Sequence, residues 1–146
     1  MGPSDTVKSE FQAAAGIEDA LTSKITVLAE YLYQGAGGYN HVDYITLPKS
    51  RFRPLLAVAY AYAQIGINVT DFSHGEFGAL VNLADGSTLA NLSLSYSLSD
   101  HFDIGGDARI PLGNEDQEFG HVQVSDSPPV AMGYPQRYSF HIKSVF

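Results

Sequence analysis

The sequence predicts an all-β protein built as an antiparallel, up-and-down meander. Two observations lead to this prediction. Apolar and polar residues alternate along most of the chain, which is the period of a β-strand with two unlike faces. The alternating runs are separated by links that contain turn-forming residues, and strands joined by short links lie beside one another as antiparallel neighbours.

The first two predicted strands span residues 8–20 and 24–35 and are joined by the short link "LTSK". The first strand has apolar and polar positions on opposite faces: Phe11, Ala13, Ala15 and Ile17 against Glu10, Gln12 and Glu18. This stretch is also compatible with a short helix. The second strand collects its apolar side chains on one face: Ile25, Val27, Ala29, Tyr31 and Tyr33.

The next two predicted strands span residues 54–70 and 76–84 and are joined by "DFSHGE". The half of the first that lies nearer Val69 alternates well, whereas the half nearer Leu55 is apolar on both sides. The second places its larger side chains together: Phe77, Ala79, Val81 and Leu83.

Three further strands are predicted at residues 88–99, 102–112 and 137–146, after the short links "ADGS" and "SLSDHF" and one long link. Each has an apolar face, made of Leu92, Leu94, Tyr96 and Leu98 in the first, of Phe102, Ile104, Ala108, Ile110 and Leu112 in the second, and of Tyr138, Phe140, Ile142 and Phe146 in the third. The long links at residues 36–53 and 114–136 contain the possible strand extensions "VDYITL" and "GHVQV".

Composition narrows the possible classes of protein. The chain forms one domain over residues 1–146, in which residues 1–6 are an artificial addition or a disordered N-terminus. A net charge of −8 argues against nucleic acid as a partner, because the chain supplies no evident basic patch for the phosphates. The absence of cysteine excludes thiol catalysis and Cys-type metal sites. The longest weakly polar run, "PLLAVAYAYAQIGI", is 14 residues, too short for a membrane-spanning helix. The start "MGPSDTVKSE" lacks the features of a signal peptide.

Alternation alone does not say which face meets water, but other features favour a transmembrane barrel. The predicted strands are long enough to cross a bilayer at a tilt. Short turns and long loops alternate along the chain, as they do in outer-membrane barrels. Aromatic residues lie near strand ends, and the polar faces use Ser, Asn and Gln with very few lysines, whereas a soluble sheet displays Lys and Glu. We therefore expect apolar side chains to face outward and polar side chains inward.

The chain end "RYSFHIKSVF" resembles the closing strand of Gram-negative outer-membrane β-barrel proteins. In that family, apolar residues at every second position before a terminal aromatic form the signal for the barrel-assembly machinery. Four residues match this pattern, Tyr138, Phe140, Ile142 and Phe146, and Ser144 departs from it. The stretches "GIEDALTSKITVLAEYLYQGAGG" and "LSYSLSDHFDIGGDARIPLG" are similar to the strand–turn–strand units of the same class.

The resemblance implies a place in the bacterial outer membrane, with lipid and the assembly machinery as partners. Single-chain bacterial barrels have an even strand number of at least eight, and the sequence predicts seven strands. Either a long link hides a strand, or the chain is the C-terminal portion of a larger barrel, which the absence of a signal peptide also favours.

A set of polar residues is expected to line the barrel lumen: Glu10, Glu18, Glu30, Asp103, Asp107, Arg109, Arg137, His141 and Lys143. This mixture of signs would bias the passage of ions through an open pore, or form a salt-bridge network in a narrow barrel. Barrel closure would bring Lys143 or Arg137 near Glu10 or Glu18, and Asp107 and Arg109 would pair locally.

No catalytic residues, cofactor or metal site are predicted. The five histidines, His41, His74, His101, His121 and His141, lack the spacing of metal ligands, and the acidic stretch "NEDQE" at 114–118 is expected to be a solvated loop. The function that follows is passive diffusion of small polar solutes through an outer-membrane barrel, or a structural role for such a barrel. The alternative is a soluble, lipocalin-like β-barrel that binds an apolar small ligand. An outer-membrane enzyme such as a lipase has no supporting motif.

Overall fold

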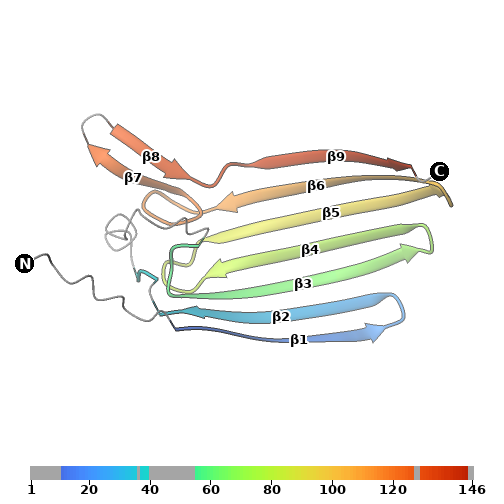
Figure 1. Ribbon diagram of the computed structural model, residues 1–146, viewed down its shortest axis with the longest axis horizontal. Coiled ribbons are helices and arrows are strands. Elements are labelled where there is room, and N and C mark those ends of the chain that lie inside the picture. The colour runs from blue at the N-terminus through green and yellow to red at the C-terminus, as the bar shows by residue number, and fades with distance from the viewer. Residues whose placement is uncertain (1–10, 36, 40–54, 127–128, 145–146) are drawn as a thin grey trace, which may run out of the picture.

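The computed structural model describes residues 11–35, 37–39, 55–126 and 129–144. Its main feature is a seven-stranded antiparallel sheet in which neighbours in sequence are neighbours in space (Figure 1). The strands in order across the sheet are β1 (Gln12–Thr22), β2 (Ile25–Gln34), β3 (Ala59–Thr70), β4 (Ser73–Asn82), β5 (Thr88–Ser99), β6 (Phe102–Leu112) and β9 (Arg137–Ser144). The all-β meander predicted from the alternating pattern is confirmed.

The alternative left open for the first segment is decided in favour of the predicted strand, and one smaller prediction is corrected. The segment that was also compatible with a helix is strand β1, paired along its length with β2. The stretch "GHVQV" belongs to strand β7 (His121–Asp126), which pairs with β8 (Pro129–Gly133) as a separate two-stranded sheet and does not extend the main one. The stretch "VDYITL" lies outside the described residues, and within the described residues no helix is long and apolar enough to cross a membrane.

The described strands do not close into a barrel, because β1 and β9 are the two edges of the sheet. Neighbouring strands alternate in direction, so the first and last of seven run the same way and cannot pair as antiparallel neighbours. The predicted approach of Lys143 or Arg137 to Glu18 is therefore absent, and Glu10 lies outside the described residues.

One end of the sheet carries three turns of two residues each, built on a common plan. A hydroxyl residue ends the first strand of each hairpin: Thr22, Thr70 or Ser99. The Thr22 hydroxyl accepts hydrogen bonds from the backbone N–H of Lys24 and of Ile25, each at 3.1 Å. Hydroxyl groups at this position satisfy turn N–H groups that the sheet leaves unpaired.

The pairing register shifts by one residue just before each of these turns. The unpaired residues are Leu21, Val69 and Leu98, and each is more than half exposed. A bulge of this kind increases the local twist and turns one side chain aside. The three short turns therefore place an exposed aliphatic side chain at the same end of the sheet.

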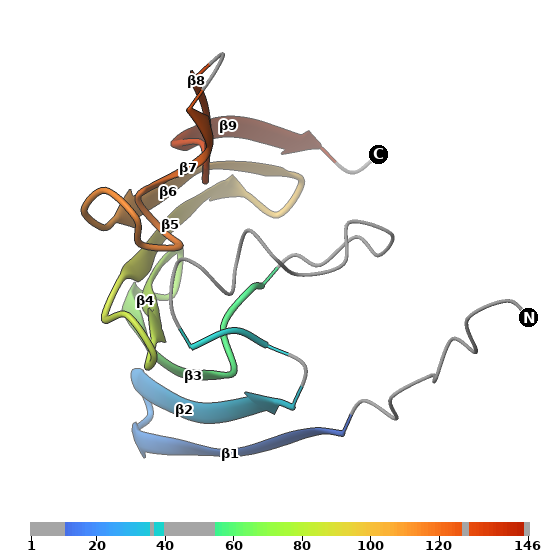
Figure 2. The same ribbon diagram turned by 90° about the vertical axis from the view of Figure 1, so that its left-hand side faces the viewer.

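The opposite end carries the longer connections between strands. In the link from β4 to β5, Gly86 has a φ of 78°, a left-handed conformation that glycine adopts at little cost. Figure 2 shows that the sheet is strongly curved from β1 to β9, and that the backbone near residues 55–58 lies on the inner side of the curve. Because the Ala57 N–H donates to the Tyr60 hydroxyl, the Tyr60 side chain points to this concave side.

The buried core is small and lies at this long-loop end, on the concave side. Ala57, Tyr60 and Phe119 are almost fully buried, together with Leu89 from the start of β5. Partly buried side chains pack around them: Leu32, Leu55, Leu56, Leu80, Ala84 and Tyr134. The segments beside the strands thus fold into the curve of the sheet and fill one end of it.

The convex face is apolar and exposed. The residues on the face opposite to Tyr60 include large apolar side chains that are at least 40% exposed: Ile17, Tyr31, Ile67, Phe77, Leu92, Leu94, Tyr96, Tyr138, Phe140 and Ile142. A folded chain normally removes such groups from water. The side chains that were expected to face outward lie on this convex face of the open sheet, and Phe146 lies outside the described residues.

Candidate functional site

The concave face of the sheet is polar away from its small core. The strand register aligns its side chains in rows that cross the sheet. One row consists of Gln64, Gly78, Asn91, Arg109 and Arg137, and the next of Gly66, Glu76, Ser93, Asp107 and Ser139. This face therefore presents hydroxyl, amide, carboxylate and guanidinium groups side by side, which is the composition of a surface that meets water.

Eight of the nine side chains that the sequence assigned to the lumen share this face by their register. They are Glu18, Glu30, Asp103, Asp107, Arg109, Arg137, His141 and Lys143. They come from both halves of the sheet and are not all in contact. The basic side chains of the set lie on β6 and β9, whereas Glu18 and Glu30 lie on β1 and β2.

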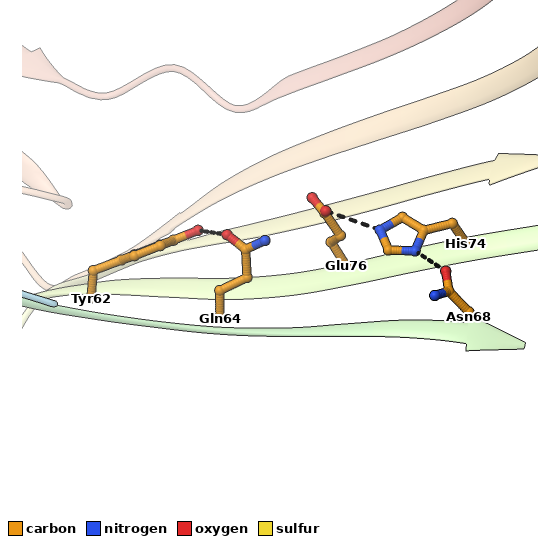
Figure 3. A network of polar contacts seen from close by, with 5 residues as sticks. All are labelled: Tyr62, Gln64, Asn68, His74 and Glu76. Carbon is orange, nitrogen blue, oxygen red and sulfur yellow. Dashed lines mark hydrogen bonds and ion pairs between the residues drawn. The ribbon is translucent and has the colours of Figure 1, made fainter. Parts of the chain in front are cut away.

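A network of polar contacts crosses β3 and β4 on this face (Figure 3). The His74 ring lies between two partners, with Nδ1 2.7 Å from Asn68 Oδ1 and Nε2 2.9 Å from Glu76 Oε1. On β3, the Tyr62 hydroxyl donates to Gln64 Oε1 at 2.6 Å. Sequence reasoning placed none of these residues in the site. Their alternate positions along β3 and β4 could have placed them on the polar face.

A second set of contacts joins β5, β6 and β9. Ser139 donates to the Asp107 carboxylate at 3.1 Å, and His141 Nδ1 lies 3.5 Å from the same oxygen. Arg109 Nε donates to Asn91 Oδ1 at 3.1 Å. The predicted local pair of Asp107 with Arg109 is thus replaced by contacts to neighbouring strands, because side chains directly opposite across a sheet are closer than those two apart along one strand.

The two sets border a groove of about 420 Å³ on the polar face. Its lining includes Tyr62, Gln64 and Glu76 on one side and Arg109 and Arg137 on the other. The volume is in the range of small-molecule sites in proteins. Polar groups with hydrogen-bonding capacity surround a space of that size, so the groove can hold water or a small polar solute.

A buried carboxylate closes the long-loop end of this face. Glu118, only 2% exposed, accepts hydrogen bonds from the Leu56 N–H, the Tyr60 hydroxyl and the Asn82 side-chain amide. Burial raises the pKa of Glu118, against the opposing effect of the Tyr60 hydrogen bond. Burial likewise raises the pKa of Tyr134, which packs edge-on against Phe119, to about 12.

The prediction of a solvated loop at residues 114–118 is therefore wrong for its last residue, Glu118. Glu118 and Phe119 are buried, and the backbone N–H of Glu118 donates to Asp85 Oδ2 at 2.8 Å. The acidic composition of the segment favoured an exposed loop over a buried one, because a carboxylate is rarely buried unless it is fully hydrogen-bonded. Phe119 was the available signal that the segment packs inward.

Nothing in the described residues points to a metal: no group of three or more His, Cys, Asp or Glu side chains there could hold a metal ion. Comparisons of the chain with protein-family models, with curated protein sequences and with solved structures found no match. The polar groove and the exposed apolar face are therefore the features from which a function can be inferred.

Proposed function

We propose that this chain forms part of the wall of a membrane-spanning β-barrel in a bacterial outer membrane, and that small polar solutes diffuse through the lumen it lines. The observation that carries the proposal is the polarity of the curved sheet. Its convex face holds exposed apolar side chains such as Leu94 and Phe140, and its concave face holds the charged and hydroxyl groups. A membrane barrel has this arrangement, with apolar side chains toward lipid and polar ones toward the interior.

Strand length and connection length support the same proposal. The strands of the main sheet contain 8–12 residues. Strands of about 9–11 residues span the hydrocarbon of a bilayer when tilted. Two-residue turns lie at one end and long connections at the other, the asymmetry typical of outer-membrane barrels.

The proposal requires further strands beside β1 and β9, because both are open edges of the described sheet. Hydrocarbon does not tolerate unpaired backbone N–H and C=O groups, so both edges need partners in a bilayer. Because β1 and β9 run in the same direction, an odd number of further antiparallel strands must lie between them. We infer that such strands complete the barrel, which agrees with a chain that contributes most of a small barrel or a portion of a larger one.

The distribution of polar and apolar side chains over the two faces supports the soluble, lipocalin-like alternative less well. A carrier of an apolar ligand requires apolar side chains on the inner side of the curve. Apart from the small core at its long-loop end, the inner side carries Glu76, Asp107 and Arg109, and the exposed aliphatic side chains of the strands are on the outer side. An aqueous lumen suits these charges better than an apolar ligand does.

Reconstitution into lipid vesicles tests the proposal. The protein is folded in detergent, transferred to vesicles and assayed for uptake of neutral sugars by osmotic swelling, with protein-free vesicles as the control. We expect insertion and swelling that falls as the sugar becomes larger. A protein that stays monomeric in plain buffer, with no association with vesicles, would contradict the proposal.

A further inference from the structure

Two arginines face each other on the polar surface of the sheet. Arg109 of β6 and Arg137 of β9 are direct cross-strand partners. Side chains in such positions have Cβ atoms about 4.5–5.5 Å apart, and like charges there destabilise a sheet. A compensating anion between the two guanidinium groups would remove this repulsion.

The chain does not supply that anion within its described residues. Arg109 donates to Asn91, which is neutral, and no carboxylate of the described residues lies within 4.0 Å of either guanidinium group. The carboxylates of the same groove have other partners, since Glu76 lies 2.9 Å from the His74 ring and Asp107 accepts from Ser139. Most guanidinium N–H groups therefore remain available to a ligand.

The rest of the groove adds hydrogen-bonding groups without further positive charge. Its lining includes the Tyr62 hydroxyl, the Gln64 and Asn91 amides, and the Ser93 and Ser139 hydroxyls. Such groups suit a ligand that carries several hydroxyls, and a volume of about 420 Å³ suits a small one. The paired guanidinium forks suit a planar carboxylate, to which arginine binds with two parallel hydrogen bonds.

We propose that Arg109 and Arg137 bind the carboxylate of a small hydroxylated organic acid, such as a sugar acid, in this groove. The inference rests on the proposed function, because it takes the groove as lumen wall, and it adds the chemical class of the solute. The carboxylate lies between the two guanidinium groups, and the hydroxyls of the ligand reach toward Tyr62, Gln64 and Asn91.

Isothermal titration calorimetry of the folded protein in detergent micelles tests this site, with sodium gluconate as the probe. Glucose is the matched neutral solute, and sodium chloride keeps the ionic strength constant. We expect saturable binding of gluconate and none of glucose. Arg109→Gln and Arg137→Gln should each weaken gluconate binding at least about tenfold, because each removes charge-assisted hydrogen bonds.

The matched control is Lys143→Gln, which makes the same change of charge on the same strand and face. Lys143 is six residues from Arg137 along β9 (143 − 137 = 6), a separation of about 20 Å. Its substitution should change gluconate affinity by less than about twofold. If either arginine variant does not fold, Arg137→Lys keeps the charge and should still weaken binding, because an ammonium group lacks the planar fork.

Several results would overturn the site. They are equal binding of glucose, displacement of gluconate by chloride, unchanged affinity in the folded arginine variants, or an equal loss in Lys143→Gln. Glucose uptake by vesicles separates this inference from the proposed function. Uptake without gluconate binding rejects the site and keeps the pore, whereas gluconate binding without uptake supports the site and rejects the pore.

Discussion

The hydroxyl of Tyr60 donates a hydrogen bond to the buried carboxylate of Glu118, which lies 58 residues later in the sequence. Tyr60 belongs to β3, and Glu118 belongs to the connection that follows β6. The same Tyr60 hydroxyl accepts from the Ala57 N–H. Through these hydrogen bonds, Tyr60 holds the connection before β3 and the connection after β6 against the concave face of the sheet.

Replacement of Tyr60 by Phe should destabilise the protein. The change leaves the aromatic ring in place, but it removes a donor to Glu118 and an acceptor for the Ala57 N–H. A buried group left without its partner costs about 1–3 kcal/mol in the free energy of unfolding. Urea unfolding in detergent micelles measures this, with the exposed Tyr96→Phe as the control. Equal unfolding midpoints for the two variants would contradict the assigned role.

Stability should also depend on pH through Glu118. Burial raises the pKa of this carboxyl in the folded state, with a further contribution from the Asp85 carboxylate, above an ordinary value of 4.5. Because the pKa of Glu118 is higher in the folded state, its contribution to stability is fully present at a pH below the ordinary pKa. This contribution is lost as the pH rises through the pKa of the folded state. The phenol of Tyr134 stays neutral over this interval, because its pKa is about 12.

Urea midpoints measured between about pH 4 and pH 8 check this dependence. We expect the midpoint to fall as the pH rises, and we expect Glu118→Gln to flatten the slope, because an amide does not titrate. Glu115→Gln is the control, since Glu115 is exposed in the same connection. A slope in Glu118→Gln equal to that of the wild type would show that other groups control the pH dependence.

The strands were predictable because their signal is local. The alternation of Leu92 and Leu94 with Ser93 and Ser95 places every side chain of β5 on a face, and the register confirms those faces. Closure was not predictable in the same way, because it depends on the total number and direction of strands. The burial of Glu118 was missed because its hydrogen-bond donors come from distant segments.

The proposed polarity of the sheet predicts opposite effects for the same substitution at adjacent positions of β5. Leu94, 56% exposed on the convex face, should face lipid, whereas Ser95 lies on the polar face. Leu94→Arg should weaken membrane insertion by about 2–4 kcal/mol if the residue lies near the bilayer midplane. Ser95→Arg should leave insertion nearly unchanged, because the aqueous lumen of the proposed barrel would hydrate the new charge.

Urea titration of the protein in lipid vesicles measures the two free energies of unfolding from the membrane. Both variants gain one arginine, so their net charge changes by the same amount. The two positions are adjacent in β5, so the new side chains lie at nearly the same depth in the membrane. A larger loss in Ser95→Arg than in Leu94→Arg would reverse the assigned faces and would support the soluble alternative.

In the proposed pore, the contact between Tyr62 and Gly78 predicts how a change in the groove would alter conductance. A Cβ atom at Gly78 would lie 2.5 Å from the Tyr62 hydroxyl and 3.0 Å from its ring carbon Cζ, so the ring must move when a methyl group is added. Gly78→Ala should break the hydrogen bond from Tyr62 to Gln64 and push the ring into the groove. We expect a lower single-channel conductance in planar bilayers than for the wild type. Gly75→Ala is the control on the same strand, because its Cβ faces Leu94 on the convex side, 3.2 Å from Cδ2. If both alanine variants conduct as the wild type does, the groove does not limit passage.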